Sequence, residues 1–118
     1  MSEHHFTLGI EEEYAIVDAK TRELKSHINT MLRQGKKGSR TRLVGENLLF
    51  QPELHQSVVE VATPVCHSMD DARRDILALR RRVIEKAEST GARIAAVGTH
   101  PFSDWKDQRI TNLSLIHI

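Results

Sequence analysis

The stretch LGIEEEYAIV, residues 8–17, has the pattern of a β-strand but carries three consecutive glutamates. Residues 6–17 alternate, so that one side of an extended chain is apolar apart from Glu12, while Glu11 and Glu13 lie on the other side. Carboxylates are uncommon inside strands, and neighbouring ones repel each other. The stretch therefore predicts a strand over residues 6–17 whose acidic side chains need a compensating partner.

The composition is that of one soluble domain, with 118 residues, 39% of them hydrophobic and 28% charged. A formal net charge of +1 gives no electrostatic basis for a nucleic-acid or anionic-membrane partner. The sequence contains no apolar run long enough to span a membrane and no signal-peptide core at its start, so we expect a cytoplasmic protein. Cys66 is the only cysteine, and we interpret it as a small buried apolar side chain.

Residues 68–91 form the clearest helix of the sequence. Ser68 is the expected N-cap, with Asp71 three residues later, and Gly91 has the position of a residue that ends a helix. The run at 80–82 is three arginines, which we interpret as the solvent-facing side. The expected core-facing stripe consists of Ala72, Ile76, Leu79, Val83 and Ala87.

The other segments are shorter. Residues 26–33 suggest a short helix capped by Ser26, residues 34–42 a basic loop, and residues 47–63 strands broken near Pro52. The stretch ARIAAVGTHPF, residues 92–102, predicts a buried strand that ends at a turn. The order β–(α)–β–α–β predicts an α/β or α+β fold with helices on one face of the sheet.

Glu11 and Glu13 are two residues apart on the predicted strand, so both side chains leave the same face, with Cα atoms roughly 6.5–7 Å apart. Two carboxylates in this arrangement can each bind a divalent cation, which would offset their mutual repulsion. A solvent-facing strand with acidic decoration is the alternative. Glu12 points to the opposite, apolar face.

Glu53 and Glu60 form a second acidic pair, and Glu60 lies among β-branched residues. A separation of seven does not place both on one face of a regular strand, so we expect Glu53 to lie in or beyond a bend after Pro52. Two strands that each bring acidic residues to one cavity would form a multi-carboxylate site for Mg²⁺ or Mn²⁺.

Three motifs occur in order: GIEEE at 9–13, E-x6-EVATP at 53–64, and GTHPF at 98–102 followed by Asp104 and Trp105. In this combination the chain resembles the N-terminal part of the glutamate–cysteine ligase type 2 family, also called YbdK-like carboxylate–amine ligases. The resemblance extends over about residues 6–111. It implies a glutamine-synthetase-like catalytic fold, of which this chain would form a partial antiparallel sheet with helices on one face.

The resemblance also implies an activity. An ATP- and Mg²⁺-dependent (or Mn²⁺-dependent) ligase would join glutamate or a similar carboxylate to cysteine or another amine through an acyl phosphate. Glu11, Glu13, Glu53 and Glu60 match the metal ligands of the family, and Glu12 matches the variable position between ligands. His100 and Thr63 are candidates for substrate binding, although His100 equally suits a role in a turn. No catalytic side chain is assigned, and a full-length member is expected to be a homodimer.

Family members are considerably longer. We therefore expect residues 1–111 to be the N-terminal part of a ligase catalytic domain, inactive alone, and residues 112–118 to be a foreign or truncated tail. Two alternatives remain open at the level of sequence. One is a non-enzymatic α/β interaction or regulatory module, and the other is a metal-dependent hydrolase, for which no general-base histidine with clear spacing is present.

Overall fold

The computed structural model describes residues 5–32 and 49–111. The predicted basic loop at 34–42 and the predicted tail at 112–118 lie outside these residues. No helix in the described ranges is long and apolar enough to cross a bilayer. In chain order, the elements are β1 (Glu11–Asp18), α1 (Ile28–Leu32), β2 (Leu49–Pro52), β3 (Val58–Ala62), α2 (Met69–Ser89), β4 (Ala92–Ala95) and a 3₁₀ turn, η1 (Trp105–Asp107).

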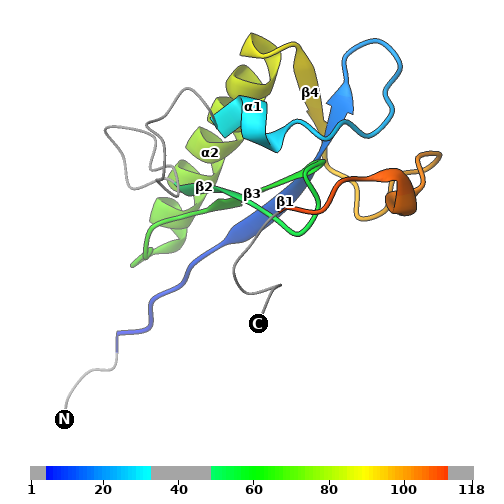
Figure 1. Ribbon diagram of the computed structural model, residues 1–118. Helices are drawn as coiled ribbons and strands as arrows, with labels where there is room; N and C mark the ends of the chain where they lie inside the picture. The colour runs from blue at the N-terminus through cyan, green and yellow to red at the C-terminus, as the bar shows by residue number, and fades with distance from the viewer. Residues whose placement is uncertain (1–4, 33–48, 112–118) are drawn as a thin grey trace.

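The four strands form one sheet in the order β2-β3-β1-β4, and each neighbouring pair is antiparallel. β2 and β3 are the two arms of a hairpin whose turn follows Pro52, as the sequence predicts. Figure 1 shows β1 running through the middle of the sheet, with α2 lying along it. The class is α+β, within the predicted range, whereas the likeness to the glutamine-synthetase fold stays a prediction.

The core lies between the sheet and the helices. One buried cluster contains side chains from every strand and both α-helices, so α1 and α2 cover the same face, as expected. The cluster consists of Tyr14, Ile16, Ile28, Met31, Phe50, Val59, Val61, Ile76, Leu79, Val83, Ala87 and Ala92.

α2 matches the sequence prediction closely. All five residues of the predicted stripe are buried. The Ser68 hydroxyl accepts a hydrogen bond from the Asp71 amide at 3.0 Å, and Gly91 adopts a φ of +79° just after the helix. The left-handed conformation is open to glycine without a steric penalty, so Gly91 ends the helix and turns the chain into β4.

The predicted strand over 6–17 begins later than expected, because regular pairing starts at Glu11. Thr63 gives the physical reason: its hydroxyl, not a main-chain carbonyl, accepts the bond from the Ile10 amide at 3.0 Å. Beyond it, Leu8 makes only an isolated bridge to Cys66. The predicted buried strand at 92–102 is also shorter, since β4 ends at Ala95 and is an edge strand of which only Ala92 is buried.

α1 begins at Ile28 and not at the predicted cap, Ser26. The Ser26 hydroxyl instead accepts a bond from the Arg109 amide, while the amides of His27 and Ile28 both donate to the carbonyl of Gln56. The His27 ring attaches this corner to the end of α2, with Nε2 3.1 Å from the Thr90 carbonyl oxygen and 3.0 Å from Oγ1 of the same residue. The helix start is therefore set by tertiary contacts.

His27 should make the stability depend on pH. Burial and the nearby charge of Lys25 lower the pKa of His27 below its ordinary value of 6.5, although the bond to Thr90 acts in the opposite direction. Protonation then favours the unfolded chain, so stability rises with pH between the lowered pKa and the ordinary one. We expect urea midpoints to fall from about pH 7.5 to about pH 5 more steeply in the wild type than in His27→Gln. Parallel curves would contradict this role of His27.

Candidate functional site

Glu13 and Glu60 lie directly opposite each other on the paired strands β1 and β3. Cβ atoms of residues paired in this way are about 4.5–5.5 Å apart, so two like charges are held side by side. Neither side chain points into the core, since Glu13 is exposed and Glu60 is half-buried. The register of the sheet thus creates an acidic pair from residues 47 positions apart in the sequence.

Glu53 completes a group of three carboxylates. It follows β2 just after the proline bend, and one oxygen from each of Glu13, Glu53 and Glu60 lies within 4.8 Å of the others. Oxygens on opposite sides of a bound Mg²⁺ are about 4.2 Å apart and those around Ca²⁺ about 5 Å, so this spacing suits one hard cation. A set of carboxylates without histidine or cysteine favours Mg²⁺ or Mn²⁺ over zinc. The residues therefore fit the cation that the family resemblance implies.

Glu11, the fourth predicted ligand, is exposed and lies opposite Ala62. The alternation of side chains along β1 places Glu11 on the same face of the strand as Glu13. It is outside the three-carboxylate group that the described residues form. Its role as a ligand stays a prediction, which would require a second cation or a movement of its side chain.

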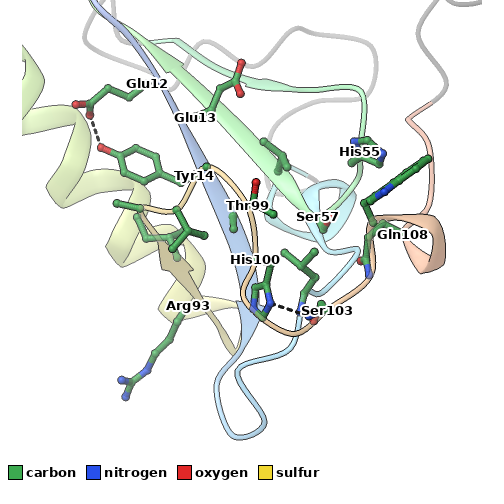
Figure 2. Close-up of a pocket in the computed structure, with 18 of the residues that line it drawn as sticks. Glu12, Glu13, Tyr14, His55, Ser57, Arg93, Thr99, His100, Ser103 and Gln108 are labelled. Atoms are coloured by element: carbon green, nitrogen blue, oxygen red, sulfur yellow. Dashed lines mark hydrogen bonds between the residues drawn. The ribbon is translucent and has the colours of Figure 1, made fainter.

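Glu12 points away from Glu11 and Glu13, as predicted, and meets α2. Arg80 donates two hydrogen bonds to its carboxylate, one of them from Nε at 3.0 Å, and the Tyr14 hydroxyl also donates to it (Figure 2 shows the Tyr14 contact). The bond from Arg80 is the main cause that lowers the pKa of Glu12, while burial is the main cause that raises the pKa of Tyr14.

Sequence reasoning placed Arg80 on the solvent-facing side of α2 and missed this contact. One feature of the sequence could have predicted it. A single carboxylate on the apolar side of a strand is costly to bury unless the covering helix supplies a positively charged partner. The interpretation as a solvent-facing side chain holds better for Arg81, which is exposed.

A cavity of about 1190 Å³ lies beside the acidic group. Glu13 and Tyr14 line it on β1, and the segment 96–100 lines it from the opposite side (Figure 2). At another part of its wall, His55 meets Trp105 edge-to-face, with ring centroids 6.5 Å apart. Because Glu13 belongs to both the wall and the acidic group, a cation held there would lie at the edge of a space large enough for a small-molecule ligand.

His100 also lines this cavity, but its ring is held by the main chain. Nδ1 accepts from the amides of Ser103 at 3.0 Å (Figure 2) and Phe102 at 3.3 Å, and Nε2 donates to the Arg22 carbonyl at 2.8 Å. These contacts favour the turn role that the sequence left open. The substrate role of His100 stays a prediction.

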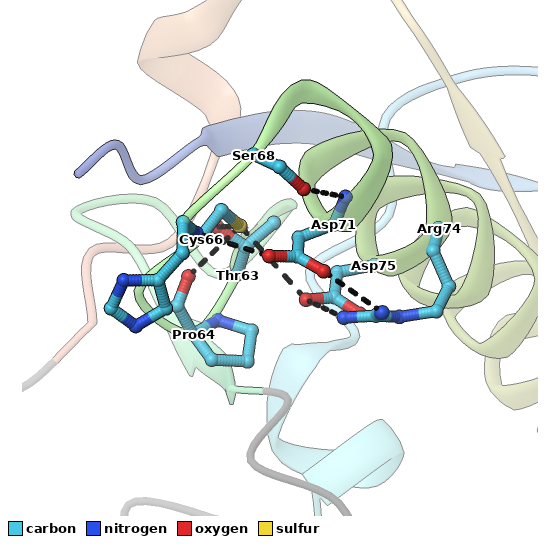
Figure 3. Close-up of polar contacts among 8 residues, drawn as sticks. Thr63, Pro64, Cys66, Ser68, Asp71, Arg74 and Asp75 are labelled. Atoms are coloured by element: carbon cyan, nitrogen blue, oxygen red, sulfur yellow. Dashed lines mark hydrogen bonds and ion pairs between the residues drawn. The ribbon is translucent and has the colours of Figure 1, made fainter. Parts of the chain in front are cut away.

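Thr63 is not among the described residues that line this cavity. Its hydroxyl accepts from the Ile10 amide and lies 3.7 Å from the Cys66 sulfur, as part of the polar contacts in Figure 3. Cys66 is buried, with its thiol 3.3 Å from the Pro64 carbonyl oxygen. Both residues join the entry of β1 to the start of α2, and a substrate contact for Thr63 stays a prediction.

Comparison with known proteins assigns the chain to a family. The model of glutamate-cysteine ligase family 2 matches residues 7–114. The chain belongs to this family. The match includes all three carboxylates of the acidic group.

Several curated relatives carry the provisional name glutamate–cysteine ligase 2. The one from Herpetosiphon aurantiacus is 50% identical over 105 residues, which cover 89% of this chain and 26% of the relative. The one from Sorangium cellulosum is 49% identical over 110 residues, or 91% of this chain and 27% of the relative. The one from Chloroflexus aurantiacus is 47% identical over 106 residues. The chain thus spans about a quarter of the length of these family members.

Proposed function

We propose that this chain is the metal-binding N-terminal part of an ATP-dependent carboxylate–amine ligase. The observation that carries the proposal is the convergence of Glu13, Glu53 and Glu60 beside a cavity, in a member of glutamate-cysteine ligase family 2. The substrates we propose are ATP, glutamate or a similar carboxylate, and cysteine or another amine, in keeping with the names of the relatives.

The proposed reaction has two steps. The carboxylate of the acceptor attacks the γ-phosphorus of ATP, and ADP leaves, which produces an acyl phosphate. The amine nitrogen then attacks the carbonyl carbon, inorganic phosphate leaves, and the nitrogen loses a proton to give the amide. Mg²⁺ or Mn²⁺, when bound, supplies positive charge that neutralises the phosphate oxygens.

The contribution of the described residues is to hold that cation beside the cavity. Glu13 and Glu60 are held opposite each other by the pairing of β1 with β3, and Glu53 follows directly on β2, the other neighbour of β3, so the three carboxylates are already close together before a cation binds. Glu11 would bind a second cation on the same face of β1. The cytoplasmic location and the homodimer of the full-length enzyme belong to the same proposal.

The first test is direct binding. Mn²⁺ titrated into the chain should show saturable binding by electron paramagnetic resonance, and bound Mg²⁺ or Mn²⁺ should raise the melting temperature. A non-enzymatic interaction module would instead be folded and insensitive to divalent cations. That result would overturn the proposed site.

The second test concerns the reaction itself. Residues 6–111 would replace the matching quarter of the Herpetosiphon aurantiacus relative, and ADP release would be measured with glutamate and cysteine, alone and together. We expect release that depends on both substrates and on Mg²⁺, with the unmodified relative as the control. Glu11→Gln in this chimera should abolish amide formation. Normal turnover in that variant would remove Glu11 from the set of ligands.

A further inference from the structure

Glu12, Tyr14 and Arg80 form a contact between the sheet and α2, which we call the Glu12 clamp. The Arg80 guanidinium donates to both carboxylate oxygens, and the Tyr14 hydroxyl donates to one of them. Tyr14 is only 7% exposed, and Glu12 is half-buried. A carboxylate bound by two donors of different elements has little freedom to rotate. The clamp thus fixes one side chain of β1 to the covering helix.

The Glu12 clamp lies on the half of β1 that β4 does not reach. β4 pairs with β1 only from Ala15 to Asp18, so the half of β1 that carries the glutamates has a strand partner on one side only among the described residues. Pairing with β3 fixes the register of this half, and on its other side no strand of the described chain holds its twist. Side chains of successive residues leave opposite faces, so anchoring Glu12 to α2 also sets the direction of Glu13.

We propose that Arg80 is a positioning residue for the cation site: by holding Glu12 against α2, it directs Glu13 toward Glu53 and Glu60. The inference rests on the proposed function, because it requires those three carboxylates to bind a cation. Arg80 and Glu12 line the same cavity as Glu13, but in the described structure Arg80 bonds to Glu12 and belongs to no part of the acidic group.

The test compares Arg80→Gln with Arg81→Gln in the 118-residue chain, with the dissociation constant for Mn²⁺ as the readout. Arg81 is exposed and lies on the next position of the same helix, so the control removes the same charge without breaking the clamp. We expect Arg80→Gln to weaken Mn²⁺ binding about tenfold, the usual effect of losing a residue that orients a ligand. Arg81→Gln should leave it nearly unchanged.

The direction of the change in Mn²⁺ affinity distinguishes a positioning role of Arg80 from a purely electrostatic one. Removing a positive charge, and freeing the negative charge of Glu12, would each attract Mn²⁺ and tighten binding. Of the effects considered, only a misplacement of the carboxylate ligands would weaken Mn²⁺ binding. Arg80→Lys, which keeps the charge and one donor, should recover part of the affinity.

Tyr14→Phe supplies a second variant that changes no charge and keeps the ring in the core. It should weaken Mn²⁺ binding by a smaller factor than Arg80→Gln, and circular dichroism would confirm that each variant is folded at the titration temperature. Wild-type affinity in both Arg80→Gln and Tyr14→Phe would overturn the positioning role alone. Absence of Mn²⁺ binding in the wild type would overturn the proposed metal site, and the positioning role with it.

Discussion

Replacing Glu60 by glutamine should weaken Mn²⁺ binding to the chain by about 100-fold, the upper end of the loss seen for residues that only support a ligand. Glu60 is the member of the acidic group that pairs across the sheet with Glu13 and also lies within reach of Glu53. Glutamine keeps the size of the side chain but removes its charge, and affinity for hard cations depends on the number of charged oxygen ligands.

The same substitution should also change how the melting temperature responds to the cation. Three carboxylates within 4.8 Å repel one another, and a cation bound between them offsets that repulsion. We therefore expect Mn²⁺ to raise the melting temperature of the wild type above its value in a chelator, and Glu60→Gln to lose this increase.

Glu85→Gln is the matched control, because Glu85 is exposed on α2 and outside the acidic group. It should change neither property. If Glu60→Gln bound Mn²⁺ as tightly as the wild type, Glu60 would not be a ligand. A change of similar size in Glu85→Gln would show that the overall charge and not the acidic group controls binding.

Leu79→Ala should destabilise the fold by about 2–5 kcal/mol, the range for truncating a buried leucine. Leu79 is 0% exposed and lies at the centre of the α2 stripe, within the cluster that joins the helix to the sheet. Small domains have a total stability of about 5–15 kcal/mol, so this loss is a large fraction of it. The cavity that remains is surrounded by residues of several elements and cannot collapse easily.

Urea denaturation would measure this loss, with Leu77→Ala as the control. Leu77 lies two residues away on the same helix and is 42% exposed, so its truncation should change stability by about 0.5 kcal/mol or less. Equal losses for the two variants would mean that α2 is not packed as described. Such a result would also remove the physical basis of the Glu12 clamp, which depends on the same packing.

The parts of the fold that follow from local pattern could be predicted from the sequence. The α2 stripe, its Ser68 cap and the left-handed Gly91 depend on residues within one helix, and all three are confirmed. The separation of Glu12 from Glu11 and Glu13 follows in the same way from the alternation of a strand. Each of these features is fixed by neighbours in the sequence.

Features that depend on contacts between distant segments were harder to predict from the sequence. The sequence suggested that Glu53 and Glu60 share a cavity with Glu13, but only the register of β1 on β3 and the bend after β2 bring them within 4.8 Å. Arg80 is 68 residues from Glu12, and its contact depends on the rotation of α2 about its axis. The late starts of β1 and α1 likewise come from bonds made by Thr63 and Ser26 to segments far away in the chain.

The short length of β4 has one more consequence. On the side of β1 that β4 leaves uncovered within the described structure, the main chain of Glu11 and Glu13 is next to an open strand edge. Edges of this kind invite strands of other molecules to add to the sheet, and charged side chains discourage such growth. We therefore expect the glutamates also to discourage edge-to-edge aggregation of the protein. A bound cation would neutralise part of that protection, so occupancy of the site and colloidal stability are expected to oppose each other.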